Sequence, residues 1–308
     1  MPSPLTASAF FYSKLSGVWG RAALISLPLA FLLVFFLLPF LLVLKISVSE
    51  MDNVLFKELI SWTDGTLQLK IRLDNYIFIF QDDLYFQTYI RSLRFAALTT
   101  VICLVVAYPF AYFMARSPAD KRPALLMLVM LPFWTSFLLR VYAWKMLLAD
   151  SGVFNNVAMA LGLLAEPVKM MNTPFSLVLG MVYTYVPFMI LPLYANLVKM
   201  DLTLLEAALD LGATPWQAFW RITVPLSKSG IIAGSMLVFV PCVGEFVIPE
   251  LLGGPQTLMI GRVLWDEFFS NNDWPMAATV AAVMVLLIIV PLALLSKYQA
   301  DGKAGGRA

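Results

Sequence analysis

The amino-acid sequence predicts an all-α integral membrane protein with six transmembrane helices. Hydrophobic residues make up 61% of the 308 residues and charged residues only 13%, with a mean hydropathy of +0.83. Soluble domains usually contain roughly 45–50% apolar and about 25% charged residues, so the surplus of apolar side chains must face lipid. A helix needs about 20 mostly apolar residues to cross a bilayer, and six segments of the chain qualify.

The six predicted spans form a single transmembrane domain over residues 22–298, between an N-terminal tail (1–21) and a C-terminal tail (299–308). Their approximate bounds are 22–44, 95–115, 124–148, 175–198, 231–252 and 276–296. The first span has a long apolar core for a signal peptide, and no small-x-small cleavage pattern follows it, so we expect it to be retained. The fifth is the least regular, because Glu245 interrupts it.

The Lys and Arg residues predict the orientation of the chain. If both termini lie in the cytoplasm, the cytoplasmic segments hold eleven basic and five acidic residues. The outer loops and the spans then hold the other ten basic and fourteen acidic residues. Because basic residues concentrate in cytoplasmic loops, we expect a multi-pass protein with both termini inside.

The two longer outer loops carry patterns of their own. Loop 45–94 contains seven acidic residues and alternating patches such as TLQLKIRL, which fit either a short strand pair or an irregular flap. Loop 149–174 contains GVFNNVAMALGLL, which predicts a short helix lying at the membrane surface.

Nine prolines lie within the predicted spans. Such breaks are tolerated where neighbouring helices or a water-lined cavity satisfy the freed backbone groups, as in transporters with broken helices around a path. The alternative is that membrane helices simply carry more proline than soluble ones.

Several function classes are excluded or disfavoured by what the sequence lacks. The chain contains no histidine, which excludes histidine metal sites, Ser-His-Asp triads and histidine proton relays. Cys103 and Cys242 both lie in apolar runs, so no disulfide framework is implied. The G-x-x-x-x-G-K-[ST] phosphate loop does not occur, so ATP is not expected to bind this chain.

A polar module over residues 201–225 separates the fourth and fifth spans. Thr203 and Glu206 fit a capping box that starts a first short helix, and Gly212 is placed to end it in the left-handed conformation. Thr214 and Gln217 fit a second capping box.

The second helix of this module has a proline at each end. Pro215 suits its first position, and Pro225 is expected to end it. Two short helices joined by a sharp bend fit a rigid element that docks into a groove on another protein. An interfacial helix resting on lipid headgroups explains the pattern equally well.

The motif within this module decides between those two readings. Glu206, Ala207 and Ala208 are followed at fixed spacing by Gly212, Ile222 and Pro225, with Val224 where leucine is usual. This pattern resembles the E-A-A signature of the permease subunits of bacterial ABC importers. The resemblance implies a type I ABC importer permease fold in the bacterial inner membrane, with residues 201–225 as the coupling helix that seats on an ATP-hydrolysing subunit. It also implies a transport subunit and not an enzyme, with no cofactor on this chain and with ATP and Mg on the partner.

Three further stretches resemble the permeases of spermidine/putrescine importers, in particular the putrescine-type member. They are VFVPCVGEFVIPELLGG (238–254), LPFWTSFLLRVYAW (131–144) and MIGRVLWDEFF (259–269). This likeness implies a heterodimer with a second permease, an ATPase dimer and a periplasmic solute-binding protein that delivers a polyamine, with membrane lipid around it and no nucleic acid. Permeases for other small solutes share parts of these motifs, so the solute stays open.

Glu245 is the first candidate for the substrate path. It lies 15 residues from Gly230, or about 22 Å along a helix, past the middle of a bilayer core about 30 Å thick. A carboxylate at that depth is expensive, and a dicationic solute would compensate its charge. The alternatives are an internal ion pair with Arg140 and a merely wetted position.

The remaining path candidates are aromatic and acidic. Trp134 and Tyr185 offer ring faces that attract ammonium groups, although most such rings in a membrane protein only pack. Trp134 has the best claim, because a helix broken at Pro132 would expose it. Asp266 and Glu267 in an outer loop either guide cations inward, contact the binding protein or are simply solvated.

A stand-alone secondary transporter driven by an ion gradient is the alternative from another class. It explains the broken helices and Glu245 but gives no reason for the capped module at 201–225. A membrane enzyme is disfavoured because no clustered catalytic set is present.

Overall fold

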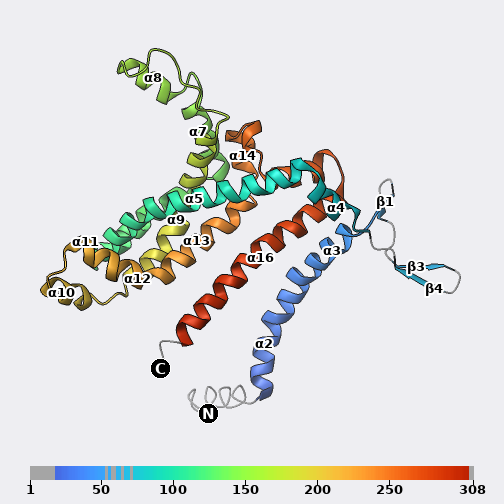
Figure 1. Ribbon diagram of the computed structural model, residues 1–308, viewed down its shortest axis with the longest axis horizontal. Helices are drawn as coiled ribbons and strands as arrows, with labels where there is room; N and C mark the ends of the chain where they lie inside the picture. Colours follow the sequence, from blue (N-terminus) through green and yellow to red (C-terminus); the bar gives the residue numbers. More distant parts are fainter. Residues whose placement is uncertain (1–17, 53–54, 57–59, 64–65, 70–71, 305–308) are drawn as a thin grey trace, which may run out of the picture. The chain divides into compact units, whose positions relative to one another are not determined.

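The computed structural model describes residues 18–304 apart from 53–54, 57–59, 64–65 and 70–71. The predicted tails 1–21 and 299–308 therefore lie partly outside the described residues. The described chain is helical except for two short hairpins (Figure 1). It groups into two compact units, one with the residues up to Ile77 together with Asn272–Val283, and the other with Phe78–Asn271 and the residues from Met284 on.

The first unit begins with one long apolar helical path. Its consecutive parts are α2 (Val18–Leu32), the π-helical turn η1 (Leu33–Leu37) and α3 (Leu38–Ser47). Within it, Leu24–Ser47 is long and apolar enough to cross a membrane, close to the predicted 22–44. Pro39, which has no backbone N–H, lies directly after the π turn at the start of α3, where a proline is tolerated.

The predicted outer loop 45–94 contains strand pairs, the first of the two forms that the sequence left open, and its last residues belong to a long helix. Antiparallel pairs form between β1 and β2 and between β3 and β4. The strands are β1 (Met51–Asp52), β2 (Leu55–Phe56), β3 (Ile60–Thr63) and β4 (Thr66–Leu69). A short helix, α4 (Asp74–Gln81), follows them and was not predicted.

The core of the second unit is a bundle of three helices that lie side by side in Figure 1. They are α5 (Asp83–Arg116), α9 (Pro174–Leu197) and α13 (Lys228–Val243). Helix α9 matches the predicted 175–198, whereas α5 starts twelve residues before the predicted 95. Small residues allow close approach: a Cβ at Gly234 would lie 2.7 Å from Met189 Sδ of α9.

The third and fifth predicted spans are broken rather than continuous. Arg122–Trp134 and Phe137–Ala160 meet at 82°, with extended backbone at Thr135 directly after Pro132 and its 3₁₀ turn. Helix α13 ends at Val243 and α14 begins at Val247. The third-span elements are α6 (Arg122–Met130), η2 (Leu131–Trp134), α7 (Phe137–Leu148) and α8 (Val153–Ala160).

The remaining elements complete the chain. They are α10 (Thr203–Asp210), α11 (Pro215–Ala218), η3 (Phe219–Thr223), α12 (Val224–Leu226), α14 (Val247–Leu252), η4 (Pro255–Thr257), α15 (Ile260–Trp265), η5 (Asp266–Ser270) and α16 (Trp274–Ala304). In the part of the chain that is described, three helices are long and apolar enough to cross a membrane, or up to five when each bent pair counts as one span. The predicted helical architecture is therefore confirmed apart from the two hairpins, while the count of six spans stays a prediction.

Candidate functional site

The first candidate site is the polar module, where the predicted bend is confirmed. Gly212 has φ 85°, a left-handed conformation that favours glycine, and ends α10. Its N–H donates to Leu209 O at 2.9 Å, and Ala213 N–H donates to Ala208 O at 3.0 Å. These two bonds form a Schellman motif, which satisfies the last carbonyls of α10 and fixes the direction of the following chain.

The two predicted capping boxes have opposite outcomes. Thr214 Oγ1 accepts from Gln217 N–H, and Gln217 Oε1 accepts from Thr214 N–H at 3.0 Å, so the second box is confirmed. The first box is wrong: Leu202 is the N-cap of α10, and Asp201 Oδ1 accepts from Thr203 N–H at 3.0 Å. The charged acceptor of Asp201 lies two residues earlier and takes the role assigned to Thr203.

Pro225 does not end the second helix as predicted. The helical path continues through α11, η3 and α12 to Leu226, and then bends by 65° into α13. The π turn η3, which contains the half-buried Ile222, directly precedes Pro225 and makes i→i−5 bonds such as Val224 N–H to Phe219 O. The path therefore accommodates a proline that lacks an N–H.

The module is attached to α5 and to the start of α13 by one ring and one hydrogen bond. The ring of Phe219 packs edge-on against Tyr108 (5.5 Å) and Tyr112 (6.0 Å) of α5. The hydroxyls of Tyr108 and Ser227 share a hydrogen bond of 2.8 Å at the bend between α12 and α13. A displacement of the module therefore acts directly on two helices of the core.

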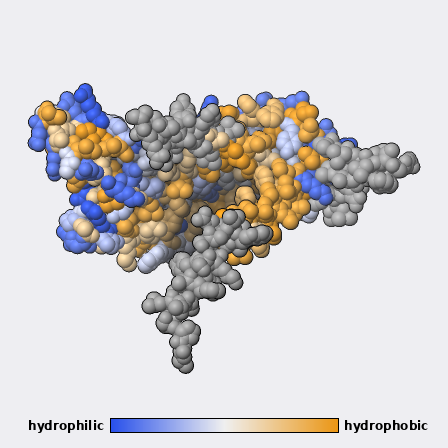
Figure 2. Space-filling model, turned by 90° about the horizontal axis from the view of Figure 1, so that it is seen from below, coloured by the Kyte–Doolittle hydropathy of each residue, from blue (hydrophilic) through white to orange (hydrophobic). Residues whose placement is uncertain are grey.

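The outer surface of the module is partly apolar. Leu211 is 89% exposed and Trp216 is 68% exposed, beside the exposed Glu206 and Ala207 and the half-buried Ala208. Figure 2 shows apolar residues mixed with hydrophilic ones at the end of the second unit that carries α10 in Figure 1. Exposed apolar side chains on a rigid, capped element are typical of a surface that docks onto a partner.

The second candidate site is the break between α13 and α14. Glu245 lies in it, and its Oε2 accepts from the Tyr185 hydroxyl of α9 at 2.5 Å. Its Oε1 accepts from the N–H groups of Val247 (3.1 Å) and Ile248 (3.4 Å) at the start of α14. The structure thus brings together Glu245 and Tyr185, two of the predicted path residues.

Contacts from distant parts of the chain hold this break open, and sequence reasoning missed them. A Cβ at Gly261 would lie 2.4 Å from Gly244 O and 2.7 Å from Glu245 O, so only glycine lets α15 approach. The preceding N–H, of Ile260, donates to Ser92 Oγ of α5 at 2.8 Å. Neither contact has a local signal, because each joins residues far apart in the sequence.

The carboxyl end of α14 is tied to α9. Leu252 O accepts from Ser176 Oγ at 2.7 Å and from Asn172 N–H at 3.1 Å. Together with Glu245 at the other end, these bonds satisfy backbone groups that a broken membrane helix would otherwise leave unpaired.

The alternative ion pair between Glu245 and Arg140 does not form among the described residues. The Arg140 guanidinium lies over the ring of Phe133 instead, 5.2 Å from its centroid. Phe133 meets Phe188 edge-on at 5.0 Å, and Phe188 lies 6.1 Å from Tyr185. The rings of Tyr185, Phe188 and Phe133 therefore form a row that ends at Arg140. Tyr185 binds Glu245 at one end of this row, and Arg140 is the cation that was expected to pair with Glu245.

Trp134 lies beside this row but takes no part in it. Its side chain is 73% exposed at the end of η2, directly before the break in the third span. The expectation that a broken helix would expose it is met, while the packed ring is that of its neighbour Phe133.

The acidic pair of the outer loop already has partners. Asp266 lies 3.9 Å from Arg262, which forms a shorter ion pair of 2.6 Å with Glu250. Glu267 Oε1 accepts from the Tyr85 hydroxyl at 2.6 Å, and its Oε2 accepts from Asn271. Both predicted residues therefore contact groups of this chain, and Glu250 is a third acid of this cluster that the sequence analysis did not name.

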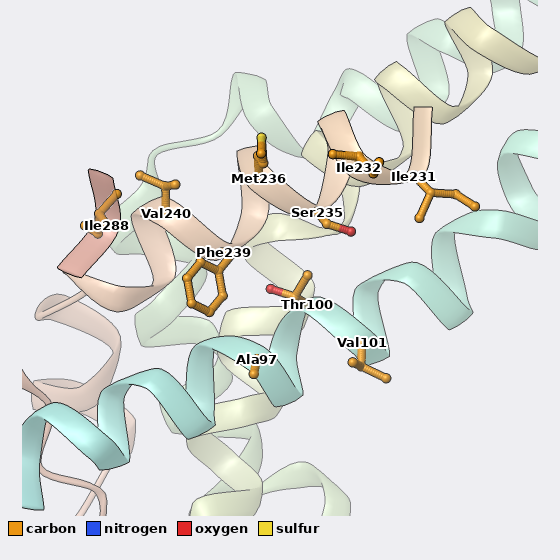
Figure 3. Close-up of a pocket in the computed structure, with 10 residues that line it drawn as sticks. All are labelled: Ala97, Thr100, Val101, Ile231, Ile232, Ser235, Met236, Phe239, Val240 and Ile288. Atoms are coloured by element: carbon orange, nitrogen blue, oxygen red, sulfur yellow. The ribbon is translucent and has the colours of Figure 1, made fainter. Parts of the chain in front are cut away.

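A separate hollow of about 400 Å³ lies between α5 and α13 (Figure 3). Its lining is aliphatic and aromatic apart from the hydroxyls of Thr100 and Ser235, and it contains no charged side chain. It has nothing to compensate a charged solute, which leaves the Glu245 break as the better candidate.

Comparisons with known proteins agree on one kind of molecule. The family described as "Binding-protein-dependent transport system inner membrane component" matches residues 18–297. The chain is 40% identical over 270 residues to the spermidine/putrescine transport system permease protein PotB of Escherichia coli (strain K12), covering 88% of this chain and 94% of that protein. It is 36% identical over 223 residues to the inner membrane ABC transporter permease protein YdcU of the same organism, covering 68% and 71%.

Among solved structures, the fold is similar to a bacterial ABC transporter involved in the import of the acidic polysaccharide alginate. The TM-score is 0.66 at 18% identity, with 94% of this chain and 98% of that chain covered. A bacterial alginate ABC transporter in complex with an alginate pentasaccharide-bound periplasmic protein gives a TM-score of 0.65 at 18% identity, with 91% and 93% covered.

Proposed function

The chain belongs to the family of binding-protein-dependent transport system inner membrane components and is an ABC importer permease subunit, and we propose that its solute is a polyamine, putrescine or spermidine. It forms half of the translocation path, with a second permease subunit as the other half of a heterodimer. A periplasmic binding protein hands over the solute, and an ATPase dimer binds ATP and Mg. Both termini lie in the cytoplasm.

The observation that carries this proposal is the position of Glu245. Its carboxylate lies in the break of a membrane helix, where two backbone N–H groups and the Tyr185 hydroxyl support it and none of the described residues supplies a pairing cation. Such hydrogen bonds stabilise negative charge in a site of low polarity. An ammonium group of the solute supplies the missing positive charge.

The ring row next to Glu245 suits the same solute. Ring faces attract ammonium groups by about 0.5–2 kcal/mol. Tyr185 contacts the carboxylate through its hydroxyl, and the ring of Phe188 lies 6.1 Å from the ring of Tyr185. Arg140 closes the far end of the row with a positive charge. The site therefore takes one ammonium group at Glu245, and the second group of the solute extends away from Arg140.

For the polar module, we propose contact with the ATPase. Glu206, Ala207, Ala208 and Gly212 lie on or directly after α10, which projects as a stiff element, and Ile222 and Pro225 lie in the path that follows. Movement of the ATPase passes through Phe219 and Ser227 to α5 and α13. Glu206→Lys is expected to abolish uptake and weaken ATPase retention in a pull-down while membrane insertion stays intact; normal retention would count against docking.

The solute is tested by reconstituting the chain with its partners and measuring uptake. Putrescine, spermidine and amino acids compete with a labelled polyamine, and only the amines are expected to compete. Glu245→Gln is expected to lower polyamine uptake at least about tenfold with the complex intact, because a neutral amide replaces a charge-assisted contact. Glu250→Gln, which changes an acid already paired with Arg262, is the control.

Two outcomes would contradict parts of the proposal. Unchanged uptake kinetics of Glu245→Gln would remove this residue from the path, and competition by amino acids alone would replace the polyamine by another small solute. Gradient-coupled flux by the chain without partners would favour a stand-alone secondary transporter.

A further inference from the structure

A continuous apolar furrow runs along α5 on the side away from the Tyr108 contacts. Two hollows of about 380 and 640 Å³ share Leu179 and Val182 of α9 in their linings. Five of their α5 residues follow one helical stripe, namely Leu98, Ile102, Val106, Phe110 and Phe113, and the buried Met114 lies beside its end. At 1.5 Å per residue the stripe is about 22 Å long, more than the roughly 15 Å of one leaflet of a bilayer core.

This chain leaves the furrow largely uncovered. Phe110 is 56% exposed, Phe113 is 63% exposed, and Leu128 of α6 on the opposite wall is 62% exposed. The furrow has an apolar lining throughout, so its occupant must be apolar along most of its length.

Basic residues gather at one end of the furrow, at the corner between α5 and α6. Arg116 comes one turn after Phe113, and Arg122 comes one turn before Leu125, so both furrow walls continue into an arginine. Lys121 adds a third cation, and Asp120 is the single acid of segment 116–122.

These arginines are partly fixed in place. Arg122 Nε donates to Ser117 O at 2.9 Å, and the Arg116 guanidinium lies 5.1 Å from the centroid of Tyr112. Arg116 Nη2 is buried and has no hydrogen-bond partner among the described residues. This N–H therefore has the capacity to donate to an acceptor from outside the chain.

We propose that this furrow binds one anionic phospholipid, with an acyl chain along the α5 stripe and the phosphate at Arg116 and Arg122. Guanidinium groups match the geometry of phosphate, and basic pockets between membrane helices bind anionic headgroups. The basic residues at one end of the furrow favour a lipid with an anionic headgroup. An apolar helix of a second protein would fill the furrow but would leave these cations without a partner. Because α5 also contacts Phe219 of the polar module, the lipid lies on a helix that moves with that module.

The test uses the full chain in nanodiscs of phosphatidylcholine that contain a small fraction of phosphatidylglycerol with a photoactivatable acyl chain. We expect cross-links concentrated in the peptides that contain Val106–Phe113 and Leu179–Val182. Replacing both arginines (Arg116→Gln, Arg122→Gln) should reduce the cross-link yield roughly thirty-fold. Lys228→Gln, which removes an exposed cation at the start of α13, should leave the yield unchanged.

A second variant protects the test against misfolding of the double arginine variant. Val106→Trp fills the furrow while all cations remain, and it should remove the cross-links from the α5 stripe. Three results would overturn the proposal: equal labelling of all apolar faces, an unchanged yield in both variants, or loss of lipid labelling at the furrow once the second permease is present.

Discussion

The polar module at 201–225 and the break at Glu245 both interrupt helices, but different kinds of contacts hold them. In the module, the bend and the second cap depend on residues within six positions of one another, such as Gly212 with Leu209 and Thr214 with Gln217. At the break, Glu245 depends on Tyr185, which is 60 residues away in the sequence. The first interruption is local and stiff, whereas the second exists only in the packed bundle.

This difference fits the tasks proposed for the two regions. An element that receives force from another protein benefits from a shape that is independent of the bundle around it. A site that admits and releases a solute benefits from support by several helices, because a relative shift of those helices changes the site. We therefore expect substitutions at the break to act through the bundle and substitutions in the module to act locally.

The largest effect is expected for Gly261→Ala. Its new Cβ would lie 2.4 Å from Gly244 O, and a backbone oxygen cannot move aside like the end of a side chain. We expect a destabilisation of about 3 kcal/mol, the upper part of the range for overpacking, seen as a lower thermal unfolding midpoint of the purified chain. Gly244→Ala is the matched control, since its Cβ would meet only Met284 at 3.5 Å. Equal midpoints for the two variants would show that α15 does not support the break.

The contrast between the regions also explains what the sequence could predict. The bend at Gly212 and the cap at Thr214 were predicted correctly because their signals are local. The predicted capping box at Thr203 was wrong although its signal is also local. Asp201, two residues earlier, is a stronger acceptor and binds the Thr203 N–H instead. The fifth span was expected to be the least regular because Glu245 interrupts it, but the support of the break by Gly261 could not be read from the sequence.

Other parts of the fold were missed for the same reason. Composition and apolar runs predict a helical membrane protein, and α9 lies where its run predicts it. A break beside Trp134 was expected but its angle of 82° was not, because a helix with Pro132 can also kink mildly, and the packing around it decides. The fixing of Glu267 by Tyr85, 182 residues apart, has no sequence signal.

Tyr185→Phe tests whether the break depends on its distant donor. The variant keeps the ring next to Phe188 but removes the hydroxyl that donates to Glu245. We expect the free energy of unfolding to fall by about 1.5–3 kcal/mol, the range for a hydrogen bond to a charged group, and the thermal unfolding midpoint to fall with it. The control is Tyr183→Phe on the same helix, whose ring packs against Trp144. If the thermal unfolding midpoint were unchanged in Tyr185→Phe but lowered in Tyr183→Phe, Tyr185 would not be the residue that supports the break.

Gly212→Ala tests the local character of the module. A Cβ there would meet no atom within 4 Å, so the cost arises only from the left-handed backbone, about 1–2 kcal/mol. The helices of the bundle take no part in this bend. We therefore expect ATPase association to fall strongly while the thermal unfolding midpoint of the chain changes little. A large fall in the midpoint with normal association would mean that the bend supports the bundle and not the partner.

The smallest effect separates the two threonines of the module, which look alike in sequence. Thr214→Ala removes a cap that accepts from Gln217 N–H and should destabilise the module by about 1 kcal/mol. Thr203→Ala removes no cap, since Asp201 already accepts the N–H of residue 203, and alanine favours the helix that starts there. Hydrogen exchange of the amides in α10 and α11 would measure both: faster exchange is expected only in α11 of Thr214→Ala. Faster exchange in α10 of Thr203→Ala would restore the capping box that the sequence predicts and reject Asp201 as the residue that starts the module.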